Sequence, residues 1–262
     1  MNYGYDCIKL FSSKEYAEQF MRGDIRMTRI SHYRTIECRI LGVKDPYEGK
    51  TKINCPKNTR LFIGAELAEM DDDDGSNIFE WRECPITNLG RSFIGADNTF
   101  CLCATDIATS TVPEGDEFKW TPEYLPFLDG YECGVLFISS ELVSKLRNYA
   151  ETNSFEFIHG LVEYKSGTMS LEEAIVSNEQ LVSAPDLIFA KDDFFGYQHE
   201  YRFALIPTLE RVSSGEKVAP GQIAFNAPVG ALHNAMCLPI GLINEMAFKE
   251  SSRTKRARWQ KP

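Results

Sequence analysis

The sequence lacks the short motifs that mark the commonest nucleotide-binding, hydrolase and metalloprotease sites. It contains no Walker loop, no G-x-G-x-x-G after an expected strand, no G-x-S-x-G elbow and no H-E-x-x-H. No apolar run reaches the roughly 18 residues that span a bilayer, and the first residues lack the basic and apolar regions of a secretory signal. We therefore set these chemistries aside and expect a protein with no membrane partner.

Patterns that bind metals are also lacking. The run Asp71–Asp74 has the composition of a calcium loop, but Met70 and Trp81 occupy positions where such a loop needs carboxylates. Cys101 and Cys103 are too close together for the paired spacing of a zinc knuckle. We expect no metal. Because eight cysteines occur without a secretory signal, we expect reduced thiols and a cytoplasmic protein.

The chain does contain enough apolar sequence for a sizeable core. Of its 262 residues, 43% are hydrophobic and 12% aromatic, which excludes global disorder. The formal net charge of -10 argues against a dedicated duplex-binding protein, whereas a basic C-terminus from Arg253 to Lys261 leaves local contact with nucleic acid open. No repeat or boundary divides the sequence, so we predict one domain over residues 1–250 and a basic tail over residues 251–262.

Apolar patterning predicts a mixture of strands and helices. The chain opens with a strand at 5–11, a helix from about Ser13, a C-cap Gly23 and a strand at 25–30. Further strands are expected at 99–105, 134–139, 194–203 and 222–225, helices at 140–152 and 170–182, and an irregular segment at 112–130. Residues 61–68 fit either a strand or a short helix.

The expected strand at 194–203 carries the most informative polar cluster. Strand side chains alternate between two faces, which puts Gln198, Glu200 and Arg202 together on one of them. One interpretation is an ordinary solvent-facing side of an antiparallel strand, with Glu200 and Arg202 paired to neighbouring strands. The other interpretation is a functional site.

Several segments resemble known proteins. The opening strand, helix, Gly23 and strand resemble the start of ADP-ribosyltransferase folds, and Gln198-x-Glu200 resembles their Q/E-x-E element. In order along the chain, the segments 45–48 and 100–105 and the Glu200-x-Arg202 strand also resemble an uncharacterised bacterial and phage family suspected of sharing that fold. The resemblance covers most of residues 5–206. It implies an α+β fold with an ADP-ribosyltransferase-like split, mostly antiparallel sheets and peripheral helices.

The resemblance also implies roles for two side chains. Breaking the nicotinamide glycosidic bond of NAD develops positive charge on the ribose, and a fixed carboxylate stabilises that charge. Glu200 would take this catalytic role. Gln198 would orient the incoming nucleophile through its amide.

The residue that would bind the nucleotide departs from the family pattern. Family members commonly carry an Arg or His on the first strand. Phe11 or Ser12 occupies that position here, with Lys9 nearby. An aromatic ring for nicotinamide and a cation for pyrophosphate could come from the segment 32–34, and a threonine could take the serine role of some transferases. The candidate NAD-binding residues are therefore Lys9, Phe11, Ser12, His32, Tyr33, Arg34 and Thr105.

The resemblance implies an enzyme that uses NAD as a substrate and transfers ADP-ribose to a macromolecule. RNA, single-stranded DNA and a protein side chain are alternative acceptors. A toxin in phage defence, with an antitoxin or inhibitor protein as partner, would fit such a family. Two alternatives stay open: a non-catalytic binding or inhibitor protein on the same fold, which the missing first-strand Arg or His favours, and an NAD glycohydrolase with water as acceptor.

Overall fold

A computed structural model describes ten stretches of the chain: residues 5–33, 50–54, 60–67, 78–85, 89–92, 98–114, 117–165, 168–170, 187–208 and 222–248. Several sequence features lie outside these stretches: Arg34, the segment 45–48, the run Asp71–Asp74, residues 171–182 of the expected helix, and the basic tail. The chain divides into two compact units. The first comprises Met1–Gly49, Ser92–Ser166 and Val182–Pro262, and the second comprises Lys50–Arg91 and Gly167–Leu181.

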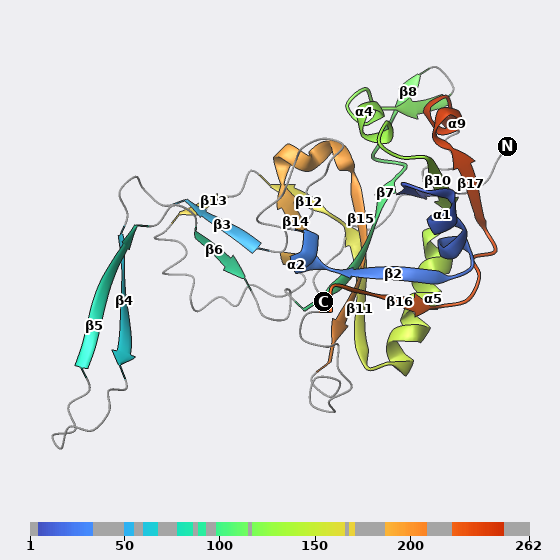
Figure 1. Cartoon of the computed structure of the whole chain (residues 1–262). Coiled ribbons are helices and arrows are strands. Elements are labelled where there is room, and N and C mark those ends of the chain that lie inside the picture. Colours follow the sequence, from blue (N-terminus) through green and yellow to red (C-terminus); the bar gives the residue numbers. More distant parts are fainter. Residues whose placement is uncertain are drawn as a thin grey trace. The chain divides into compact units, whose positions relative to one another are not determined.

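The first unit is built on an eight-stranded antiparallel sheet (Figure 1). Its strands are β1 (Cys7–Phe11), β2 (Asp24–Arg29), β7 (Phe100–Asp106), β10 (Cys133–Phe137), β11 (Phe155–Leu161), β15 (Glu200–Pro207), β16 (Ala224–Pro228) and β17 (Ala235–Pro239). The main path runs β11-β15-β7-β1-β10-β17, and β2 and β16 form a side branch from β7. The expected strands at 5–11, 25–30 and 99–105 are confirmed.

The sheet splits along one edge of β7. On its other edge, β7 pairs with β15 along its length, from Leu205 opposite Phe100 to Glu200 opposite Thr105. On the split edge, the start of β7 pairs with β2 and its end pairs with β1. β1 and β2 thus begin two arms of the sheet. The arms diverge because β1 and β2 each have only two positions paired with β7. Lys9 is the first residue of β1 beyond those pairs.

Helix α1 (Lys14–Met21) joins the two arms. Ser13 caps it, since the Ser13 hydroxyl accepts a hydrogen bond from the Tyr16 amide at 3.4 Å. Gly23 ends the turn with φ 87°, and a Cβ added there would lie 2.1 Å from the Gly230 carbonyl oxygen. The helix and its C-terminal glycine were predicted, and both are confirmed.

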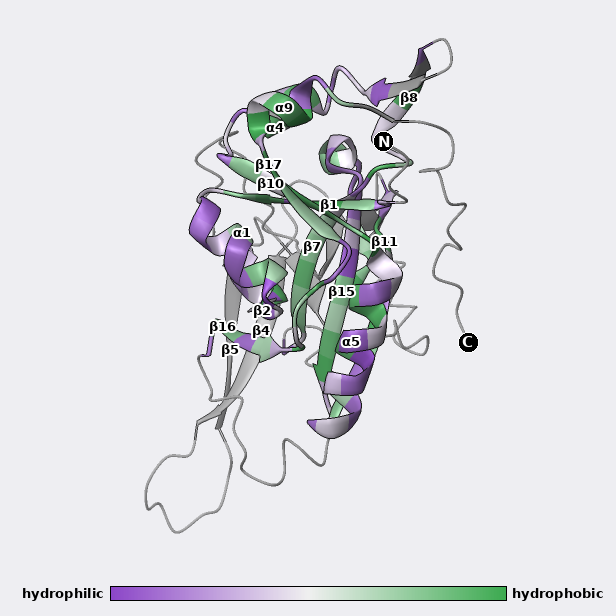
Figure 2. Cartoon of the chain, turned by 90° about the vertical axis from the view of Figure 1, so that its right-hand side faces the viewer, coloured by the Kyte–Doolittle hydropathy of each residue, from purple (hydrophilic) through white to green (hydrophobic). Residues whose placement is uncertain are grey.

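The core of the first unit lies mainly between the sheet and its two longer helices, α1 and α5 (Ser139–Thr152). Leu142, Leu146 and Ala150 of α5 are buried, while the other sides of α1 and α5 are hydrophilic (Figure 2). Buried strand residues in the same cluster include Phe100, Leu102, Phe137, Tyr201 and Phe203. The helix expected at 140–152 is confirmed, and it begins one residue earlier.

The opposite face of β7 and β15 holds a smaller cluster. Paired residues of antiparallel strands point to the same face, so Cys101 and Ala204 lie together there. They pack with Ile30 of the short helix α2 (Ile30–Tyr33) and with Ile188 and Phe189. Farther along this same face, Cys103 is paired with Arg202 and Thr105 with Glu200. The polar residues Glu200 and Arg202 of β15 are buried on this face.

Smaller elements complete the two units. In the first unit they are β8 (Thr111–Glu114), β9 (Glu117–Trp120), β18 (Ala247–Phe248), α4 (Leu125–Leu128), α9 (Ile240–Asn244), β12 (Glu163–Lys165), β14 (Ala190–Asp192) and the 3-10 helix η2 (Asp193–Gln198). In the second unit they are β3 (Lys50–Asn54), β4 (Arg60–Leu67), β5 (Ile78–Pro85), β6 (Leu89–Ser92) and β13 (Thr168–Ser170). Residues 61–68 are thus largely strand, and the expectation of an irregular segment at 112–130 was wrong.

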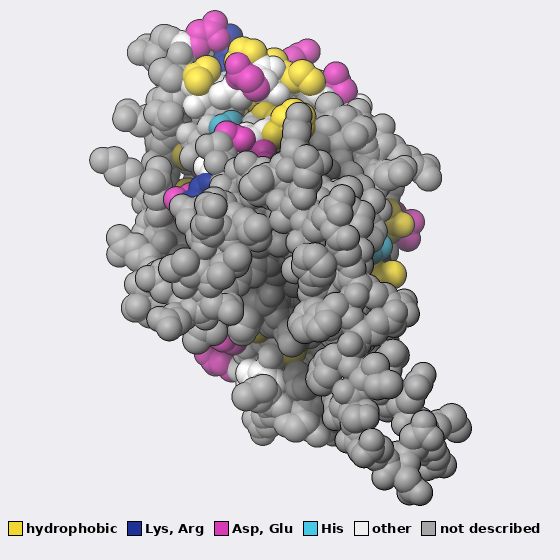
Figure 3. All heavy atoms as spheres, turned by 90° about the vertical axis from the view of Figure 1, so that its left-hand side faces the viewer, with side chains coloured by type: hydrophobic (Ala, Val, Ile, Leu, Met, Phe, Trp, Pro, Cys, Tyr) yellow, Lys and Arg dark blue, Asp and Glu magenta, His cyan; other side chains and the backbone are white. Residues whose placement is uncertain are grey.

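Side chains of different types are unevenly distributed over the surface. Hydrophobic and acidic side chains gather at the end of the first unit that carries β8 and α4, at the top of the view in Figure 3. Val112, Leu125 and Leu242 are among the exposed large hydrophobic residues. Within the stretches that the structure describes, no helix is long and apolar enough to cross a membrane.

Candidate functional site

The expected strand over residues 194–203 was wrong in its first half. Residues 193–198 form the 3-10 helix η2, because the Asp192 carboxylate accepts a hydrogen bond from the Phe194 amide at 3.0 Å and caps the turn. His199 then takes a left-handed conformation with φ 44°, and β15 begins at Glu200. Gln198 and Glu200 therefore do not alternate along one strand.

Glu200 and Arg202 form a buried, two-pronged ion pair. Arg202 donates from Nε to Glu200 Oε1 at 2.6 Å and from Nη2 to Glu200 Oε2 at 3.2 Å. The Arg202 Nη1 group donates to the Ile188 carbonyl oxygen. The exposed fractions of the Glu200 and Arg202 side chains are 7% and 1%, so the interpretation of a solvent-facing strand was wrong. Such a paired geometry fixes the carboxylate in direction as well as in position.

A second cation reaches the same carboxylate from the small parallel pair of strands β12 and β14. Lys191 Nζ lies 3.1 Å from Glu200 Oε2 and donates to Gln198 Oε1 at 2.9 Å. Lys191 is paired with Tyr164 across the two strands, and the Tyr164 hydroxyl accepts a hydrogen bond from the Glu200 amide at 2.8 Å. Glu200 is thus held through its side chain and its backbone.

The two cations keep Glu200 ionised. Burial by itself raises the pKa of a carboxyl group, but the charges of Arg202 and Lys191 and their hydrogen bonds outweigh it, and the pKa of Glu200 lies well below its ordinary value. Burial also raises the pKa of the Cys103 thiol, and the charge of Glu200 raises it further, to about 12. The site therefore presents a permanent carboxylate beside a protonated thiol at neutral pH.

Two candidates from the start of the chain come near this cluster. Burial lowers the pKa of Lys9, while the charges of Cys103 and Glu200 act in the opposite direction. Burial raises the pKa of the Tyr33 phenol, and the Tyr33 hydroxyl donates to the Cys101 carbonyl oxygen at 3.4 Å. Lys9 and Tyr33 thus interact electrostatically with Glu200 from the two arms of the split sheet.

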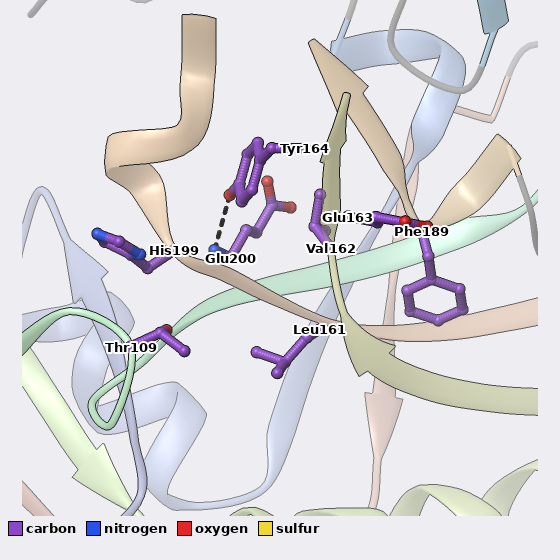
Figure 4. Close-up of a pocket in the computed structure, with 8 residues that line it drawn as sticks. All are labelled: Thr109, Leu161, Val162, Glu163, Tyr164, Phe189, His199 and Glu200. Carbon is purple, nitrogen blue, oxygen red and sulfur yellow. Dashed lines mark hydrogen bonds between the residues drawn. The ribbon is translucent and has the colours of Figure 1, made fainter. Parts of the chain in front are cut away.

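Glu200 lies in the wall of a pocket of about 580 Å³. Its lining residues are Thr109, Leu161, Val162, Glu163, Tyr164, Phe189, His199 and Glu200 (Figure 4). In the close-up, the Tyr164 ring stands over Glu200, and the His199 ring and Thr109 lie on one side of the pocket. A volume of this size suits a small-molecule ligand.

The remaining predicted residues are placed differently. Phe11 packs on Phe20 with ring centroids 5.5 Å apart, and Ser12 is exposed. His32 is half-buried on α2. The Thr105 hydroxyl donates to the Gln198 carbonyl oxygen at 3.3 Å and so supports the turn before Glu200. The pocket lining includes Glu200 and none of the six candidate NAD-binding residues that the structure describes.

Three residues of the site were missed from the sequence. Lys191 and Tyr164 gave no local signal, because only the pairing of β12 with β14 brings them to Glu200. In the expected strand at 194–203, alternation puts His199 on the face opposite Glu200. The signal that could have corrected this is Asp192-Asp193 followed by Gly196, a helix start followed by a turn former.

No protein-family model, no curated protein and no solved structure matches this chain. Within the described stretches, no group of three or more His, Cys, Asp or Glu side chains is arranged to hold a metal ion.

Proposed function

We propose that this protein cleaves NAD and transfers ADP-ribose to a macromolecule, with Glu200 as the essential carboxylate. The observation that carries the proposal is an ionised carboxylate, locked by Arg202 and Lys191, in the wall of a pocket of about 580 Å³. The branched sheet supports the proposal, because the resemblance to ADP-ribosyltransferase folds implies mostly antiparallel sheets. Lys9 and Tyr33 approach the Glu200 carboxylate from the two arms of this sheet.

The reaction would use the carboxylate as a fixed negative charge. The bond between ribose C1′ and the nicotinamide nitrogen breaks, nicotinamide leaves with the electron pair, and positive charge develops on the ribose. A carboxylate that stays ionised stabilises that charge without a proton transfer of its own, and its rigid support avoids reorganisation during the reaction. The acceptor then forms the new bond to C1′.

Arg202 and Lys191 would act as positioning residues in this reaction. Arg202 donates hydrogen bonds to both oxygens of Glu200, and Lys191 donates to Glu200 Oε2 and to the Gln198 amide oxygen. The pocket also contains the Tyr164 ring, an aromatic surface on which a flat nicotinamide or adenine could stack. NAD would bind against this wall.

One observation favours a second candidate, a non-catalytic nucleotide-binding protein. A carboxylate has about four acceptor positions, and three of the Glu200 positions are filled by donors from Arg202 and Lys191. The Cys103 thiol also hydrogen-bonds to Glu200. In this alternative the carboxylate is a structural ion pair at the floor of a binding pocket, and NAD would bind without being cleaved.

The test uses the full chain with NAD labelled on its adenylate. Free nicotinamide and label bound to macromolecules are followed with and without added cell lysate, and the labelled fraction is separated into RNA, DNA and protein. We expect nicotinamide release together with labelled macromolecule. Release with no labelled macromolecule would indicate a glycohydrolase, and no release under either condition would refute both enzymatic proposals.

The matched variants are Glu200→Gln and Glu163→Gln. Both residues line the pocket, but Glu163 has a largely exposed side chain paired with Lys165 at 2.9 Å. We expect Glu200→Gln to lower nicotinamide release by about 100-fold or more, the usual scale for one electrostatic group at a reacting centre. Glu163→Gln should stay within about threefold of the wild type. Undiminished activity in Glu200→Gln would refute the assignment of the carboxylate.

A further inference from the structure

His199 lines the pocket and has an unusual backbone conformation. An ordinary strand residue between Gln198 and Tyr201 would point away from Glu200. His199 takes a left-handed conformation with φ 44° directly before β15, and it lines the pocket together with Glu200 (Figure 4). Residues other than glycine seldom adopt this conformation, and strained positions of this kind cluster at functional sites.

Gln198 is not available for the acceptor role that its place in the sequence predicted. Its amide oxygen accepts a hydrogen bond from Lys191 at 2.9 Å, and its amide nitrogen donates to the Tyr197 hydroxyl at 3.4 Å. Gln198 is also not among the residues that line the pocket. The acceptor side of the site is therefore the side that carries His199 and the exposed Thr109.

Within the described part of the chain, the only hydrogen bonds found for His199 are those of its backbone. Its amide donates to the Gly196 carbonyl oxygen at 3.2 Å, and its own carbonyl oxygen accepts from the Asp106 amide at 2.9 Å. These two bonds fix the backbone on both sides of the ring. The imidazole itself is left to interact with whatever occupies the pocket.

We propose that His199 is the general base that activates the acceptor, an inference that rests on the proposed ADP-ribosyl transfer. The acceptor X–H attacks ribose C1′ while the C1′–nicotinamide bond breaks with its electron pair. The proton of X–H passes to a ring nitrogen of His199 and then to solvent. Glu200, which is permanently ionised, keeps its separate role of stabilising the ribose.

A base at this position also limits the chemical class of the acceptor. A carboxylate or phosphate oxygen is already anionic and needs no base to remove a proton. The geometry instead favours a neutral group that loses a proton as it reacts, such as a hydroxyl or a nitrogen that carries hydrogen.

The surroundings of His199 suit a base that works near neutral pH. Burial lowers its pKa, and the charge of Glu123 acts in the opposite direction. Other titratable or charged residues on the elements around it are Asp106 of β7, Glu163, Tyr164 and Lys165 of β12, Lys191 and Asp192 of β14, Asp193 and Tyr197 of η2, and Glu200 and Arg202 of β15. Because the pKa stays below its ordinary value, the ring is neutral and able to accept a proton at pH 7.

The test compares His199→Asn with the wild type in the labelled-NAD assay, measured as kcat/KM against pH. Asn tolerates the left-handed conformation but cannot accept a proton, so the fold should be kept. We expect the wild-type rate to fall as pH drops through the His199 pKa. In His199→Asn, transfer should fall by about 100-fold to 10000-fold, and the acidic limb should disappear. NAD affinity, measured by equilibrium dialysis, should be unchanged.

Two further variants separate a chemical role from a structural one. His233→Asn is the matched control, because His233 is an exposed histidine with no place in the pocket, and it should behave as the wild type. His199→Gly also fits the positive φ, and added imidazole should restore part of its activity if the lost group is a base.

Three results would overturn the inference. The first is wild-type transfer by His199→Asn, the second is an unchanged acidic limb in that variant, and the third is a loss of NAD affinity parallel to the loss of rate. Failure of the proposed function looks different, because the wild type itself would then release no nicotinamide. That result would remove the role of His199 together with the function.

Discussion

The ion pair between Glu200 and Arg202 gives the sharpest test of how this site is held together. Replacing Glu200 with Gln keeps the side-chain shape but leaves Arg202 and Lys191 as two buried cations without a carboxylate. Replacing Arg202 with Met removes the guanidinium and leaves Glu200 with Lys191 alone. The double variant removes both charges of the pair.

The expected magnitudes follow from the burial of the pair. Breaking a buried ion pair by removing one partner costs about 3 to 5 kcal/mol, since the other charge stays buried without compensation. We expect each single variant to lower the free energy of unfolding by about that amount. The double variant should be less destabilised than the sum of the singles by about 1 to 3 kcal/mol, because the two side chains contact each other directly.

Urea unfolding of the four proteins, followed by tryptophan fluorescence and far-UV circular dichroism, measures these differences. A control pair is Lys14 and Glu18, an exposed ion pair at 3.8 Å, whose coupling energy should be below about 1 kcal/mol. Single-variant costs that add to within about 0.5 kcal/mol in the double variant would show that the buried pair contributes no coupling. That result would contradict the role of Arg202 in keeping Glu200 ionised.

Three further predictions concern pH, thiol chemistry and backbone geometry. The depressed pKa of Glu200 stabilises the fold at pH values above the ordinary glutamate pKa of about 4.3. The free energy of unfolding, measured by urea titration, should therefore fall between pH 5 and pH 3. This fall should be smaller in Glu200→Gln. Cys103, with a pKa near 12, should react slowly with iodoacetamide at pH 8, and mass spectrometry should show its alkylation accelerating up to about pH 12; rapid labelling at pH 7 would contradict the raised pKa. Gly23→Ala should lower the thermal midpoint by several degrees, since φ is 87° and the new Cβ would meet the Gly230 carbonyl oxygen at 2.1 Å. Gly241→Ala, on a helix with nothing within 4 Å of the new Cβ, is its control and should be neutral or stabilising.

Local patterns were sufficient for the opening of the chain. Ser13 before a helical apolar stripe, Gly23 after it, and alternation from Ile25 to Ile30 each act over a few residues, and the structure confirms all three. The same holds for β7 and α5, where a short apolar run and a long amphipathic stripe leave few alternatives.

Around Glu200, the sequence pattern predicted the local structure only in part. Alternation correctly puts Glu200 and Arg202 on one face, because both lie on β15. It failed upstream, since the Asp192 cap stabilises η2 and competes with the strand. A side chain that caps a backbone amide outweighs the weak strand preference of Phe and Tyr over so short a segment.

By itself, the sequence determined a folded, mixed α and β chain without a common catalytic motif, and it singled out Glu200 as a polar residue among apolar neighbours. Only the tertiary structure decided what surrounds that carboxylate. The cations that keep it ionised are Arg202 on its own strand and Lys191 on β14, and His199 with its positive φ lies beside it in the lining of the pocket. Local preference acts between neighbours in sequence, whereas burial and charge act between neighbours in space, and the chemistry of this site depends on the second kind.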